Sequence, residues 1–194
     1  VHGFDHIERY LRVRLQMHLI EGTDMKILLA AALLHDASGS HPGEGNRNDH
    51  HLRSAEFAET ILLKENWEPS KIRAVQHCIR AHRFREDERP QTIEAKVLFD
   101  ADKLDVIGAI GVTRALAYAF QVKQPAFADP SKEFMRSGKK EVGEPHSAYH
   151  EYVFKLKKIS GVLLTETAKK IAGHRQIYLN GFFEELANEM KTKK

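Results

Sequence analysis

Apolar residues recur every three to four positions along most of the chain, and the alternating pattern of half-buried strands is rare. Segments rich in glycine and proline, at 37–48 and 124–145, interrupt this pattern. The pattern predicts an all-α protein with about seven helices. These helices are expected over residues 4–20, 25–35, 49–65, 69–82, 92–122, 147–159 and 163–190.

We expect residues 1–194 to form a single domain, with the helices of about residues 147–190 packed on its core. Hydrophobic residues make up 42% of the chain, enough for a sizeable core, and the net charge is only +3. The longest apolar run, residues 27–34, is too short to cross a membrane. We therefore expect no membrane and no nucleic-acid partner. A single cysteine, Cys78, forms no internal disulfide, so a reducing, cytoplasmic location is expected.

Histidine is abundant, with 12 residues, and one histidine marks the end of the most apolar helix. His35 and Asp36 follow directly after the apolar run 27–34. An imidazole and a carboxylate at such a position are costly to bury unless something satisfies both. Adjacent helical residues point about 100° apart, so both can reach one ion near the helix end. A divalent cation and a simple histidine–aspartate hydrogen bond are both consistent with the pair alone.

A second cluster of carboxylates lies inside the apolar segment 92–122. Asp102 and Asp105 are three residues apart and share one helix face. This cluster indicates either a nearby cation or an exposed acidic stripe, and Lys103 would neutralise part of its charge. A further histidine, His6, falls on the polar side of the first expected helix. Together with the His35–Asp36 pair, histidines and aspartates on three helices offer four ligands, with positions left for water and substrate.

The chain resembles the HD superfamily of metal-dependent phosphohydrolases, whose ligand pattern is H…HD…D. The resemblance follows nearly the whole sequence and is most specific in residues 94–111. It also includes residues 2–9, 31–36, 53–56, 79–84, 155–156 and 165–172. It implies a helical HD-domain bundle whose metal ligands are His6, His35, Asp36 and Asp102. The divalent ion is Mn, Mg, Ni, Co, Zn or Fe, and the sequence does not select among them.

Enzymes of this family often have further histidines near the ion. These donate hydrogen bonds to the phosphate of the substrate or bind a second metal. The candidates are His50, His51 and His82. His82 is favoured over His77 because it matches the family's histidine and because the two cannot face one site equally on a regular helix. The sequence does not decide between His50 and His51.

Charged residues near the expected ligands are candidates for a part in the reaction. Asp36 or a nearby histidine is the expected proton acceptor, and Lys103, next to the expected ligand Asp102, is expected to offset the charge that builds on the phosphoryl oxygens. Arg53 and Arg83 are candidate substrate contacts. Asp105 is expected to orient a ligand histidine from behind.

The expected function is therefore hydrolysis of a phosphoester or phosphoanhydride of a nucleotide by metal-activated water. The partner is a small phosphorylated substrate, and a homodimer is left open. Three alternatives remain. These are a di-iron oxygenase built on the same fold, a non-catalytic metal-binding helical module, and a structural helical protein whose histidines and aspartates are ordinary hydrogen-bonded pairs.

Overall fold

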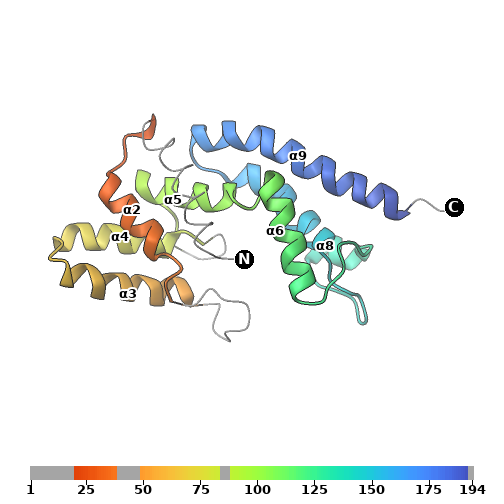
Figure 1. Ribbon diagram of the computed structural model, residues 1–194, viewed down its shortest axis with the longest axis horizontal. Coiled ribbons are helices and arrows are strands. Elements are labelled where there is room, and N and C mark those ends of the chain that lie inside the picture. The colour runs from red at the N-terminus through yellow and green to blue at the C-terminus, as the bar shows by residue number, and fades with distance from the viewer. Residues whose placement is uncertain (1–19, 39–48, 84–87, 192–194) are drawn as a thin grey trace. The chain divides into compact units, whose positions relative to one another are not determined.

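The protein is helical throughout the part of the chain that the structure describes. The structure is a computed structural model, and it describes residues 20–38, 49–83 and 88–191. These ranges contain eight α-helices, one 3-10 helix and no strand, so the expected all-α class is confirmed (Figure 1). The helices are α2 (Met25–Leu34), α3 (His50–Lys64), α4 (Pro69–Ala81), α5 (Ile93–Leu104), α6 (Gly108–Gln121), α7 (Lys132–Ser137), α8 (Ala148–Phe154), η1 (Leu156–Val162) and α9 (Glu166–Lys191).

The chain divides into two compact units, and the division falls within α5. The N-terminal unit comprises residues 2–102 and 164–168, and the C-terminal unit comprises residues 103–163 and 169–194. That all 194 residues form one domain therefore stays a prediction. The helix expected over 4–20 lies outside the described residues except for Ile20. Within the described residues, no helix is long and apolar enough to span a membrane.

Three helices, α2, α3 and α4, pack together in the N-terminal unit (Figure 1). Their starts follow from local sequence. Asp24 caps α2 by accepting hydrogen bonds from the backbone N–H groups of Lys26 and Ile27, and Pro69 begins α4, where no backbone donor is needed. The faces in contact are lined by aliphatic side chains and small alanines that allow close approach. They include Leu28, Ala31, Ala32, Ala55, Ala58, Ile72, Val75 and Ile79.

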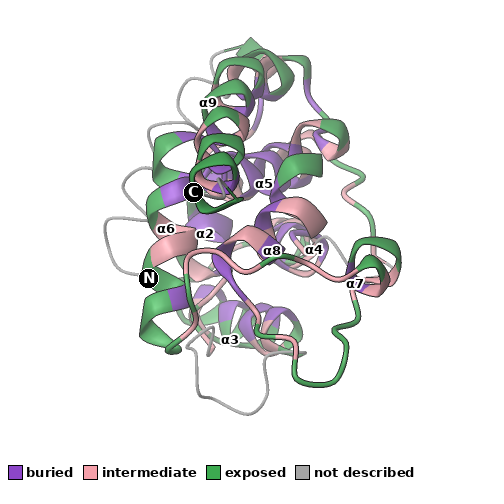
Figure 2. Cartoon of the chain, turned by 90° about the vertical axis from the view of Figure 1, so that its right-hand side faces the viewer, coloured by how far each residue is buried: buried purple, intermediate pink, exposed green. Residues whose placement is uncertain are grey.

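A buried carboxylate ties α5 to the start of α9 within the same unit. The Asp100 side chain has no exposed surface. It accepts hydrogen bonds from the backbone N–H groups of Leu164 and Thr165, at 2.9 and 2.7 Å, and from the Thr165 hydroxyl at 2.7 Å. A buried carboxylate with this many donors is well solvated by the protein. Much of α5 is buried, as Figure 2 shows.

The single helix expected over 92–122 is wrong: the chain forms two helices with a break at residues 105–107. Gly108 has φ +74°, a conformation that glycine adopts readily. The end of α5 is held by arginines distant in sequence. The Arg175 guanidinium donates to the Leu104 carbonyl at 2.7 Å, and Arg114 pairs with the Asp105 carboxylate. The bond from Arg175 satisfies a backbone carbonyl that a continuous helix would otherwise satisfy.

The C-terminal unit contains one short helix, α7, inside the segment 124–145 that was expected to be a loop. Glu144 anchors this segment: its carboxylate accepts from Ser131 N–H at 2.7 Å and from the Ser131 hydroxyl at 2.8 Å. Buried His150 lies 3.0 Å from the same carboxylate through Nε2 and 2.7 Å from the Ser147 hydroxyl through Nδ1. The helix expected over 147–159 is divided into α8 and the 3-10 helix η1.

Candidate metal centre

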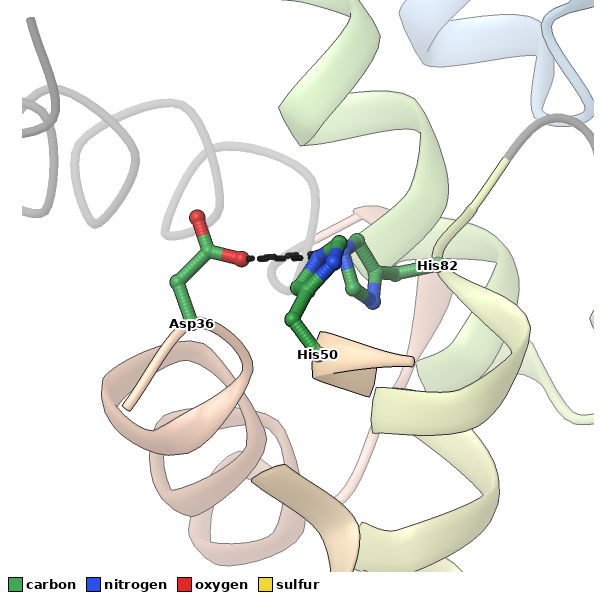
Figure 3. A group of neighbouring side chains, drawn as sticks. All are labelled: Asp36, His50 and His82. Carbon is green, nitrogen blue, oxygen red and sulfur yellow. Dashed lines mark ion pairs between the residues drawn. The ribbon is translucent and has the colours of Figure 1, made fainter. Parts of the chain in front are cut away.

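Three side chains from three elements of the N-terminal unit point toward one another (Figure 3). Asp36 lies in the turn that follows α2, His50 is the first residue of α3, and His82 caps the C-terminus of α4. One ligand atom from each lies within 4.8 Å of the others. We call Asp36, His50 and His82 the metal triad.

The Asp36 carboxylate is the common point of this group. Its Oδ1 lies 3.4 Å from His50 Nε2 and 3.9 Å from His82 Nε2, and the two imidazole rings have centroids 5.6 Å apart. Its Oδ2 lies 3.6 Å from His35 Nε2. Four donor groups of the types that borderline divalent metals prefer therefore meet at one helix end.

The tautomers of two histidines are set by backbone carbonyls. His35 Nδ1 lies 2.8 Å from the Ala32 carbonyl, and His82 Nδ1 lies 2.5 Å from the Ile79 carbonyl. A carbonyl only accepts, so each Nδ1 carries a proton and each Nε2 is the ring nitrogen that lies near Asp36. Holding the far nitrogen in this way is how proteins orient histidines that bind metals. The residues therefore fit a divalent cation by donor type and by ring orientation.

The surroundings of Asp36 favour the charged form of its carboxyl group. Burial by itself raises the pKa of its carboxyl group, but the hydrogen bond to His50 and the charges of His35 and His82 outweigh burial and lower the pKa. The negative charge of Asp102 opposes them and raises it. A carboxylate that stays charged while mostly buried is a strong ligand for a cation.

The other residues expected from the sequence occupy different places. His35 adjoins the metal triad, and its ring centroid is 5.2 Å from that of His82. Asp102 is half-buried on α5 and acts on Asp36 through its charge. His6 lies outside the described residues. The four-ligand set His6, His35, Asp36 and Asp102 therefore stays a prediction.

The structure distinguishes the histidines that the sequence left open. His50 reaches Asp36, while His51 is buried beside it with the ring centroids 5.8 Å apart. His77 is engaged elsewhere: its Nδ1 contacts Glu88 at 2.7 Å, and its Nε2 accepts from the Gln91 backbone N–H at 3.1 Å. His82 rather than His77 therefore lies in this group, and its role at the site stays a prediction.

The charged residues expected to act on substrate remain predictions. Arg53 on α3 and Arg83 after α4 are half-buried, and Lys103 is buried near the end of α5. Asp105 is also buried, and its carboxylate pairs with Arg114. This contact was missed from the sequence because the eight residues between the two partners were assigned to an unbroken helix.

The chain belongs to the HD domain family. The family model described as HD domain matches residues 3–107, which is more than half of the 194 residues. The matched range contains all three residues of the metal triad. Much of the C-terminal unit lies beyond it.

Several relatives share both sequence and fold with this chain. The Bacillus subtilis protein YpgQ is 26% identical over 197 residues, which cover 97% of this chain and 84% of YpgQ. The crystal structure of YpgQ in complex with ADP has a TM-score of 0.75, with 98% of this chain and 90% of that chain covered. A crystal structure from Lactobacillus plantarum is 28% identical, with a TM-score of 0.76 and coverages of 99% and 89%. A predicted HD-superfamily hydrolase from an uncultured Thermotogales bacterium is 25% identical, with a TM-score of 0.63 and coverages of 97% and 82%.

Proposed function

We propose that the protein is a metal-dependent phosphohydrolase that cleaves a phosphoester or phosphoanhydride bond of a nucleotide. The observation that supports this most is the metal triad, in which a charged carboxylate and oriented imidazoles meet at one helix end. A divalent cation bound there polarises a phosphoryl oxygen and lowers the pKa of water.

The residues of the chain divide the remaining work. His82 and His35 present Nε2 because their Nδ1 protons are bound to backbone carbonyls. Asp36, whose charged form its surroundings favour, is proposed as a ligand, and Asp36 or a nearby histidine is proposed to accept the proton from water. Lys103, which directly follows Asp102, is proposed to offset charge on the phosphoryl oxygens, together with Arg53 or Arg83.

A nucleotide is the proposed substrate class because YpgQ, 26% identical to this chain, was crystallised in complex with ADP. The phosphate product shows which bond is cleaved, and the nucleotide that is hydrolysed shows which base is accepted. Pyrophosphate released from nucleoside triphosphates indicates a pyrophosphohydrolase, and orthophosphate released from monophosphates indicates a nucleotidase.

The experiment measures both products from a panel of nucleotides, with metal-free protein reconstituted in turn with Mn, Mg, Ni, Co, Zn and Fe. Asp36→Asn is expected to abolish product release, since a neutral amide is a weaker ligand and accepts no proton at neutral pH. Asp129→Asn is the matched control, because Asp129 is a surface aspartate whose side chain is 67% exposed. Full activity in Asp36→Asn contradicts the proposal. Oxygen uptake with bound iron and no phosphate product favours the oxygenase instead.

A further inference from the structure

The distance between Asp36 and His50 is not set by helix packing alone. Both α2 and α3 pack mainly against α4 and less against each other. Asp36 lies beyond the end of α2, and His50 begins α3 at a point where Asp49 makes no side-chain capping bond. Some other contact must hold these two backbone segments in register if both side chains are to reach one ion.

Two serines provide such a contact. The Ser38 backbone N–H donates to the Ser54 hydroxyl oxygen at 3.2 Å, and the Ser38 hydroxyl donates to the Arg53 carbonyl at 3.4 Å. These two hydrogen bonds join the turn after α2 to the first turns of α3. We call Ser38 and Ser54, with these two bonds, the serine clasp.

The serine clasp lies next to both ligands along the chain. Ser38 is two residues after Asp36, and Ser54 is four residues after His50, so Ser54 and His50 share one face of α3. Ser54 has no exposed surface. A methyl group in place of its hydroxyl would leave the Ser38 N–H without this acceptor.

We infer that Ser54 is a positioning residue of the metal centre, which holds the turn bearing Asp36 at the distance from α3 that lets Asp36 and His50 bind the same cation. This inference rests on the proposed function insofar as the metal triad binds a metal. Ser54 acts through the backbone of Ser38 and does not itself touch the metal or the substrate.

The test is calorimetric titration of the full-length, metal-free protein with Mn²⁺. Ser54→Ala is expected to raise the Kd for Mn²⁺ about tenfold, the lower end of the effect of removing outer partners of metal ligands. Ser38→Ala is expected to raise it less, because the Ser38 N–H still reaches Ser54. Thr60→Ala is the matched control: it removes an exposed hydroxyl of the same helix, which donates to the Glu56 carbonyl at 3.2 Å.

A second control separates positioning from general loss of stability. Ile72→Val removes one methylene from the buried core of α4 and lowers stability without touching the serine clasp. Thermal unfolding with and without Mn²⁺ is measured for each variant. We expect the midpoint rise on adding Mn²⁺ to shrink in Ser54→Ala and to stay as in the unaltered protein in Ile72→Val.

The outcomes distinguish this inference from the proposed function. If the unaltered protein binds Mn²⁺ and Ser54→Ala binds it equally well, Ser54 has no positioning role and the proposed function stands. An equal loss of affinity in Ile72→Val also overturns the inference. If the unaltered protein binds none of the six metals, both proposals fail. If Ser54→Ala does not fold, Ser54→Cys decides, because its thiol is a weak acceptor of similar size: weaker binding supports the positioning role of Ser54, and unchanged binding overturns it.

Discussion

Removing the Asp100 carboxylate should strongly destabilise the N-terminal unit. The side chain is buried and accepts three hydrogen bonds from Leu164 and Thr165, two of them from backbone N–H groups. Asp100→Ala leaves these donors without their acceptor, and each buried donor left in this state costs about 1–3 kcal/mol. Allowing the Thr165 hydroxyl to rotate to another partner, we expect a loss of about 4 kcal/mol in the free energy of unfolding.

Asp100→Asn tests the same reasoning at smaller scale. One oxygen remains as an acceptor, but the amide NH₂ group now faces a donor. The loss of one hydrogen bond to a charged acceptor costs about 1.5–3 kcal/mol, so Asn should be intermediate between Asp and Ala. Asp129→Ala and Asp129→Asn are the matched controls, since Asp129 is exposed and its carboxylate forms a surface ion pair with Lys191 at 2.9 Å. We expect each to change stability by less than about 0.5 kcal/mol.

The assay is urea unfolding followed by the fluorescence of Trp67, the single tryptophan of the chain. Trp67 follows α3 in the N-terminal unit, so its emission reports on the unit that contains Asp100. Free energies come from the linear dependence on urea concentration. A loss below about 1 kcal/mol for Asp100→Ala would refute the assignment of this carboxylate as a structural tie.

Three further predictions concern other parts of the chain. The pKa of Glu144 is lowered to about 2, chiefly by the hydrogen bond from the Ser131 N–H. The Glu144 carboxylate therefore stabilises the fold above pH 4.5 and loses this effect as the pH falls through about 2. Urea unfolding across pH should show that Glu144→Gln lowers the free energy of unfolding most above pH 4.5 and has little effect near pH 2. Gly108→Ala should cost about 1 kcal/mol or more in thermal unfolding because Gly108 has φ +74°, whereas Gly173→Ala, with open space around a helical position, should stabilise by about 0.5–1 kcal/mol. Burial raises the pKa of Cys78 to about 12, so a thiol reagent should modify it only on unfolding, and rapid modification of the native protein would contradict this burial.

Local sequence was sufficient to predict most helices. Periodicity with a capping aspartate and an N-terminal proline placed α2 and α4 within a residue of their observed ends. The break after α5 was missed because the group that satisfies the Leu104 carbonyl is Arg175, 71 residues further along the chain. The only local sign of the break is the glycine at position 108. A glycine within an apolar segment can equally allow close helix packing, so it does not by itself indicate a break.

The candidate site was predicted only in part, because some of its residues have a local sequence signal and others are selected by tertiary packing. The His35–Asp36 pair stands out in sequence because it ends the most apolar helix, and Asp36 is indeed the common point of the metal triad. The choice between His50 and His51 depends on how α3 is rotated about its axis against α2 and α4. That rotation is a property of tertiary packing, and adjacent histidines at a helix start give no local signal of it.

Metal binding by the metal triad is tested most directly by equilibrium dialysis of the metal-free protein against Co²⁺, with bound metal quantified and its visible absorption recorded. The account predicts that the unaltered protein binds Co²⁺ and that Asp36→Ala, His50→Ala and His82→Ala each weaken binding and change the spectrum. The control His174→Ala, at an exposed position of α9, should bind as the unaltered protein does. Undiminished binding and an unchanged spectrum in all three triad variants would contradict the assignment of the metal centre.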